Sequence, residues 1–180
     1  MRITFLFSLL IIFCASCELP PVDNSAYLPS KQSLANDVRA RTAFQLKREK
    51  GLIPFGIAGQ MMHEIKMLGL SFQYHTEIGV EEMRKLLLTS GELFLNVINS
   101  NELIRHYLNN YPFEVENIEI KIFLIKPNGT LFDLDKLHYA TMVKGKLKYV
   151  IQSSDNNLYK TIYSETYEEA VEKLGFAASF

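Results

Sequence analysis

Cysteine is scarce in this sequence of 180 residues, which contains only Cys14 and Cys17. Two cysteines so close together do not build the disulfide framework of a small secreted protein, and they leave no set of four ligands for a structural zinc ion. The histidines are His63, His75, His106 and His138. None stands at metal-ligand spacing from another, and no HExxH motif occurs. The sequence therefore predicts no metal ion and no other cofactor.

Signatures of catalysis and of charged partners are missing as well. The chain has no GxSxG nucleophile elbow, and the glycines of residues 51–59 lack a P-loop lysine. The net charge is only −1, so nothing indicates a nucleic-acid partner. Tryptophan is absent, and the tyrosines and phenylalanines alternate at positions expected to be core rather than forming a stacking platform with basic neighbours. We therefore expect a protein without catalytic residues, which is not an enzyme.

One apolar run stands at the beginning of the chain. Arg2 supplies a positive charge, residues 3–13 are apolar except for Thr4 and Ser8, and the small residues Ala15 and Ser16 precede Cys17. This order is typical of a secretory signal peptide. The run is shorter than the roughly 20 residues that cross a bilayer. No apolar run long enough to cross a bilayer follows it in the sequence.

The segment Phe13-Cys14-Ala15-Ser16-Cys17 resembles the lipobox of bacterial lipoproteins, with Cys14 standing where the family usually has Leu, Val or Ile. In that family a dedicated signal peptidase cuts just before a cysteine whose thiol has been acylated. The resemblance implies lipidation of Cys17 and membrane anchoring through its acyl chains, which hold firmly when there is more than one. Two alternatives remain: Cys17 is an ordinary thiol after cleavage elsewhere, or the segment stays uncleaved as a short anchor.

The resemblance also implies a domain organisation and a location. Residues 1–16 are expected to be the signal peptide, 17–30 the lipidated cysteine and a flexible tether rich in proline, and 31–180 a single domain. In the family's sorting rule an aspartate directly after the cysteine retains a protein in the inner membrane. Glu18 occupies that position, so we expect a cell-envelope protein facing the periplasm, at the outer membrane rather than the inner one.

Hydrophobic periodicity predicts the elements of the domain. Residues 31–50 favour a helix that Gly51 ends, and the helix that Gly79 opens has the clearest apolar stripe, with Val80, Met83 and Leu87 on one face. A capping box, Thr166 to Glu169, predicts a last helix. Strands are expected over 68–74, 117–126, 139–143 and 147–151, an apolar loop over 51–60, and a short helix over 102–110.

This order predicts an α+β domain: a mostly antiparallel sheet of about four strands with helices packed on one face. The stretches Tyr107–Phe113 and Asn117–Phe123 also resemble small lipoproteins of Gram-negative bacteria without an assigned activity. That resemblance implies a class of protein and no chemistry.

Three functions follow as hypotheses. The first is a non-enzymatic, lipid-anchored envelope protein that binds or helps to assemble an envelope protein partner. The second is an exported protein that binds a small ligand or peptide in an apolar pocket under residues 51–60, lined by Phe55, Ile57, Phe72 or Phe94. The third is a hydrolase whose dispersed polar cluster is His75, Glu77 and His106, which requires these side chains to lie within hydrogen-bond reach or one water of each other.

Overall fold

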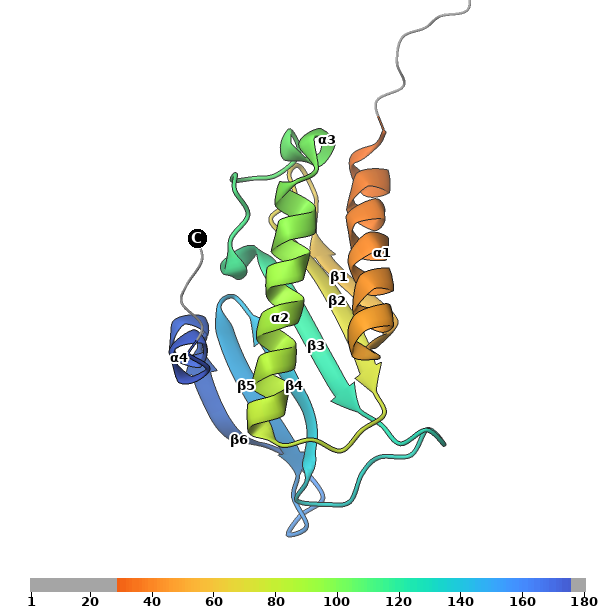
Figure 1. Ribbon diagram of the computed structural model, residues 1–180, viewed down its shortest axis with the longest axis vertical. Helices are drawn as coiled ribbons and strands as arrows, with labels where there is room; N and C mark the ends of the chain where they lie inside the picture. The colour runs from red at the N-terminus through yellow and green to blue at the C-terminus, as the bar shows by residue number, and fades with distance from the viewer. Residues whose placement is uncertain (1–28, 176–180) are drawn as a thin grey trace, which may run out of the picture.

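The computed structural model describes residues 29–175, which fold as an α+β domain (Figure 1). The helices are α1 (Lys31–Lys50), α2 (Val80–Asn99), α3 (Glu102–Arg105), the 3₁₀ turn η1 (Val115–Asn117) and α4 (Tyr167–Lys173). The strands are β1 (Ile53–Gln60), β2 (Met67–Tyr74), β3 (Ile118–Leu124), β4 (Leu137–Val143), β5 (Lys146–Gln152) and β6 (Tyr159–Thr166). None of the described helices is long and apolar enough to cross a membrane.

The six strands lie in the sheet in chain order, from β1 to β6. β1 and β2 form a hairpin, and α2 crosses over to β3, which pairs parallel to β2. The remaining pairs are antiparallel, so β3 to β6 form a meander. The predicted α+β class is confirmed, and most strand pairs are antiparallel as predicted. The prediction of about four strands is wrong, because the sheet has six strands and is mixed through the parallel β2–β3 pair.

Both strands that the sequence did not predict lie at the edges of the sheet. β1 runs through the stretch expected to be a loop, and it contains Pro54, Gly56 and Gly59. Proline and glycine weaken a strand signal, yet an edge strand tolerates them because one side of its backbone needs no partner. β6 follows the strand expected to be the last one, so β5, which carries Lys146 and Lys148, is an inner strand.

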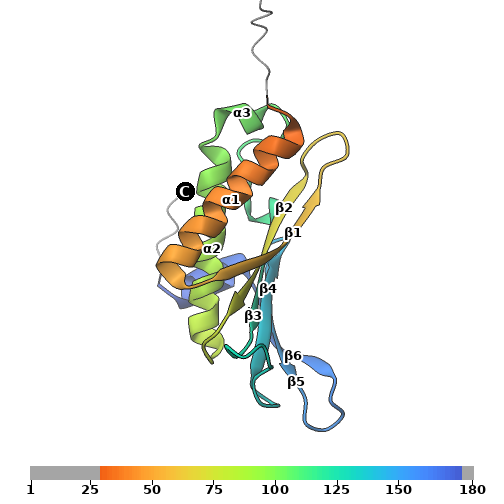
Figure 2. The same cartoon turned by 90° about the vertical axis from the view of Figure 1, so that its right-hand side faces the viewer.

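The helices pack against one face of the sheet, as Figure 2 shows from the side. α1 begins where the Ser30 hydroxyl accepts a hydrogen bond from the Ser33 N–H at 3.1 Å, and it ends at Gly51, whose φ of 70° suits glycine. The predicted capping box starts α4: the Thr166 N–H donates to the Glu169 carboxylate at 2.8 Å, and the Glu169 N–H donates to the Thr166 hydroxyl at 3.2 Å.

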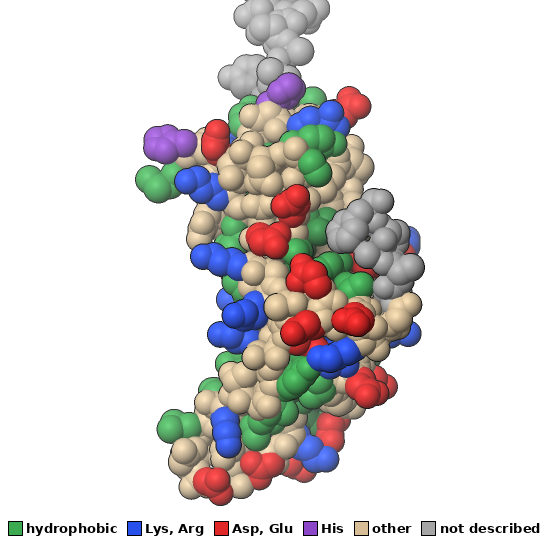
Figure 3. Space-filling view, turned by 90° about the vertical axis from the view of Figure 1, so that its left-hand side faces the viewer, with side chains coloured by type: hydrophobic (Ala, Val, Ile, Leu, Met, Phe, Trp, Pro, Cys, Tyr) green, Lys and Arg blue, Asp and Glu red, His purple; other side chains and the backbone are tan. Residues whose placement is uncertain are grey.

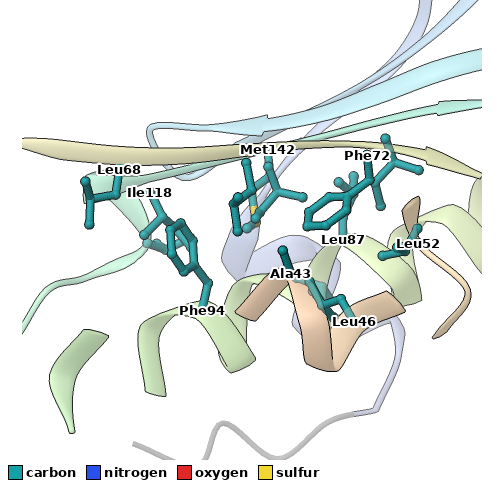
Figure 4. Packing of buried hydrophobic residues seen from close by; sticks show 14 of the residues in the cluster. Ala43, Leu46, Leu52, Leu68, Phe72, Leu87, Phe94, Ile118 and Met142 are labelled. Carbon is teal, nitrogen blue, oxygen red and sulfur yellow. The ribbon is translucent and has the colours of Figure 1, made fainter. Parts of the chain in front are cut away.

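The core lies between α1, α2 and the sheet (Figure 4). Leu87 and Phe94 of α2 are completely buried, as are Phe72 of β2 and Ile118 of β3. Gly91 lies where α2 packs closely on the sheet, since a Cβ there would overlap the Met142 side chain. The apolar stripe predicted for this helix is therefore confirmed as its buried face.

Candidate functional site: the open face of the sheet

The face of the sheet turned away from the helices has no layer of described residues over it (Figure 2). Along β3, Ile118, Ile120 and Ile122 point to the helices, and the alternate residues point to the other side. We call this other side the open face. Because strand register aligns side chains across neighbouring strands, the residues of the open face form rows that run across the sheet.

One such row is aromatic, and we call it the aromatic row: Phe55 of β1, Phe123 of β3, Tyr139 of β4 and Tyr159 of β6. The ring centroids of Phe55 and Phe123 are 5.4 Å apart, those of Phe123 and Tyr139 are 5.3 Å apart, and those of Tyr139 and Tyr159 are 5.6 Å apart. The two outer rings, Phe55 and Tyr159, are each 54% exposed. A continuous, partly solvated aromatic surface of this kind is a common component of protein interfaces.

The next row along the strands carries hydroxyl and amino groups. The register aligns Ser71, Lys121, Thr141, Lys148 and Ser164, which we call the lysine row. In the row after the lysine row, Glu119 is only 7% exposed. Its Oε1 forms an ion pair with the Lys121 Nζ at 2.5 Å. Figure 3 shows the open face in profile on the left, where the surface is hollowed and lysine and arginine side chains gather.

The sequence reasoning missed this surface because it assigned the aromatic residues to the core. Phe123 is one of the phenylalanines expected in the core, but the helices cover only one face of β3 and Phe123 lies on the other. The residues that share a strand face with each aromatic residue could have indicated that the aromatic residue is exposed. Phe123 shares its strand face with Lys121, and Tyr139 shares its face with Thr141, so these aromatic residues lie among solvent-facing neighbours.

A second polar group lies on the helix side of the sheet, which we call the Glu165 cluster: Arg84, Tyr149, Tyr163, Glu165 and Lys173. One oxygen of the Glu165 carboxylate accepts from the Arg84 Nε at 2.7 Å and the Tyr149 hydroxyl at 2.6 Å. The other accepts from the Tyr163 hydroxyl at 3.2 Å and the Lys173 Nζ at 2.9 Å. Lys173 also donates to the Tyr163 hydroxyl.

The electrostatics of this cluster favour a structural role. Burial would raise the pKa of Glu165, but hydrogen bonds from Arg84, Tyr149 and Lys173 outweigh burial and lower that pKa. The pKa of Tyr149 is raised by burial and by its hydrogen bond to Glu165. The Glu165 side chain has no solvent-exposed surface, and its four donors occupy both oxygens. The carboxylate therefore joins β5, β6, α2 and α4 and leaves no oxygen open to a substrate.

Acid should weaken this cluster. The lowered pKa of Glu165 contributes stability that is complete above the unfolded-state pKa of about 4.3 and is lost as the pH falls through the folded-state value. We expect Glu165→Gln to be less stable than wild type at pH 7, and the difference to shrink below about pH 4. Urea unfolding of both proteins from pH 7 to pH 3 measures it. A difference that stays constant over this range would contradict the charge-based explanation.

The polar cluster predicted from the sequence does not assemble. His75 follows the last residue of β2, whereas His106 lies near the other end of that strand, because the Ile65 N–H donates to the neighbouring Tyr107 carbonyl at 2.7 Å. A strand of eight residues separates its ends by roughly 25 Å. Glu77 pairs instead with Lys136 at 3.0 Å. These three side chains therefore cannot act on one substrate.

The predicted apolar pocket under residues 51–60 is not formed by its expected lining either. Phe55 and Ile57 are 54% and 63% exposed, while Phe72 and Phe94 are buried in the core. A cleft of about 320 Å³ lies elsewhere, where the start of α2 meets β5 and β6, and acidic residues including Glu77 and Asp135 line it. No group of three or more His, Cys, Asp or Glu side chains within residues 29–175 is placed to hold a metal ion.

The chain matches no protein-family model, no curated protein and no solved structure. The predicted lipidation site, Cys17, and most of the predicted tether lie outside the residues that the structure describes. The candidate site is therefore defined by geometry alone. This site is the uncovered face of the sheet, where the aromatic row lies beside the lysine row.

Proposed function

We propose that this chain is a lipid-anchored cell-envelope protein whose domain binds a protein partner on the open face of its sheet. The observation that carries the binding role is the aromatic row, which is continuous and half-exposed at both ends. Tyrosine and phenylalanine are enriched at protein interfaces because a rigid ring offers a large contact area at low entropic cost. The anchor rests on the lipobox-like sequence that ends at Cys17.

A binding role fits the described residues better than a hydrolytic one. His75 and His106, proposed for a hydrolase, lie at opposite ends of β2. The buried carboxylate of Glu165, whose pKa is lowered, already accepts hydrogen bonds from four donors. An anchor at Cys17 and a tether to α1 would hold the open face a short distance from the membrane, where an envelope partner is within reach.

The anchor is tested by labelled-palmitate incorporation and intact mass on wild type and on Cys17→Ala. We expect label in wild type and none in Cys17→Ala, together with a wild-type mass that corresponds to cleavage before Cys17 and addition of acyl chains. Cys14→Ala is the matched control, because cleavage before Cys17 removes residue 14, and it should keep the label. Unlabelled wild type cleaved elsewhere would make this an exported protein without a lipid anchor and would reject that part of the proposal.

A further inference from the structure

We propose that the partner contributes an acidic, extended polypeptide segment that crosses the strands along the lysine row and the aromatic row. This inference rests on the proposed function, because it names the chemistry of the partner at the same face. The strands are about 4.8 Å apart, so the five spacings from β1 to β6 span about 24 Å, and an extended segment of about seven to eight residues covers them.

The charge of the open face favours an acidic segment as the partner. The open face carries Lys121, Lys146 and Lys148 against the single acid Glu119, which already pairs with Lys121. Neither Lys146 nor Lys148 has an ion-pair partner within the described part of the chain. Exposed acids lie on the helix side, among them Glu81 and Glu82 of α2 and Glu168 and Glu172 of α4, and Figure 3 shows acidic side chains gathered away from the hollowed profile. The last turn of α1, also on the helix side, carries the bases Lys47, Arg48 and Lys50. The charge argument therefore rests on the open face itself, where the lysines would attract an acidic segment that contacts the aromatic row.

The geometry of the aromatic row favours a polypeptide partner over a nucleic acid. Phe123 and Tyr139 are stacked at an interplanar angle of 28°, so each uses a ring face on the other and turns its edge outward. Nucleic-acid bases stack on exposed ring faces. Phe123 and Tyr139 each have one ring face covered by the other ring. Ring edges are electropositive, so they attract the carbonyl and carboxylate oxygens of a peptide.

Two other occupants fit less well. A second copy would bring one lysine-bearing face against another, which is unfavourable because like charges repel. A bilayer is flat over the width of one domain, whereas the open face is hollowed in profile (Figure 3). A narrow acidic segment satisfies both the charge and the shape.

The test uses the full processed chain in non-ionic detergent and three labelled peptides of about eight residues, alternating Val with Glu, Gln or Lys. Fluorescence anisotropy measures binding to each, and to a single-stranded oligodeoxythymidylate, at low and high salt. We expect the Glu peptide to bind, with an affinity that falls as salt screens the lysines. Lys148→Glu and Tyr159→Ala should each weaken it by roughly tenfold or more. The control Lys85→Glu, at an exposed position of α2, should leave it within about twofold.

The outcomes separate this inference from the proposed function. Equal binding of the Glu and Gln peptides, both weakened by Tyr159→Ala but not by Lys148→Glu, would keep the protein-binding face and reject its acidic specificity. No binding of any peptide, or binding that neither substitution weakens, would reject both. Tighter binding of the oligonucleotide would replace the peptide by a nucleic acid. Circular dichroism of each variant excludes misfolding as the cause of a loss.

Discussion

Replacing Leu87 by aspartate is expected to unfold the domain. Leu87 is completely buried on the face of α2 that packs against the sheet (Figure 4). The substitution removes apolar contacts and forces a carboxylate into the core, while Arg84, one turn earlier on α2, already pairs with Glu165. A buried unpaired charge is among the most destabilising changes known. A cost of about 4 kcal/mol or more is a large part of the roughly 5–15 kcal/mol that stabilises a domain.

Thermal unfolding followed by circular dichroism measures this effect. We expect Leu87→Asp to lower the Tm by about 10 °C or more, or to abolish the cooperative transition. Lys85→Asp is the matched control, because residue 85 lies on the same helix and is exposed, so its Tm should change by only a few degrees at most. A Tm for Leu87→Asp equal to that of the control would mean that the assigned buried face of α2 is wrong.

Replacing Arg84 by leucine should have the second-largest effect. Arg84 is 7% exposed and donates from Nε to the buried Glu165. Removing one partner of a buried ion pair typically costs about 3–5 kcal/mol, because the remaining charge stays desolvated. Lys173 still pairs with Glu165 from the surface, and it would compensate in part. We expect a marked decrease in the free energy of unfolding.

A double-mutant cycle separates the charge from the packing. Chemical denaturation of Arg84→Leu, Glu165→Leu and the combined variant should show that the double variant recovers part of the loss of either single one. The exposed control is Arg41→Leu, whose ion pair with Asp37 joins side chains that are 68% and 42% exposed, and it should cost at most about 1 kcal/mol. If Arg84→Leu is as mild as Arg41→Leu, the Glu165 cluster does not stabilise the domain.

The elements that could be predicted from the sequence are those whose signals are local. The bounds of α1 match the prediction because Lys31–Lys50 contains no proline and Gly51 ends it in a left-handed conformation. The stripe of α2 and the capping box of α4 depend on residues three or four apart. The alternation of β3 was equally clear. Lipidation at Cys17 and the envelope location also follow from a short motif, and they stay predictions.

The sequence alone thus determined α1, α2, α4, the inner strands and the α+β class, since helix and strand periods are properties of consecutive residues. The helix expected over 102–110 is shorter than predicted, because α3 covers only Glu102–Arg105. Only the tertiary structure decided which strands pair and which face stays open. β1 is a strand because β2 supplies its hydrogen bonds, and β2 and β3 become parallel because α2 carries the chain across the helix face. Arg84 and Glu165 are 81 residues apart in sequence. Such contacts form when the chain closes on itself, so neither residue carries a local signal of the other, and the aromatic row likewise emerges only when strands distant in sequence lie side by side.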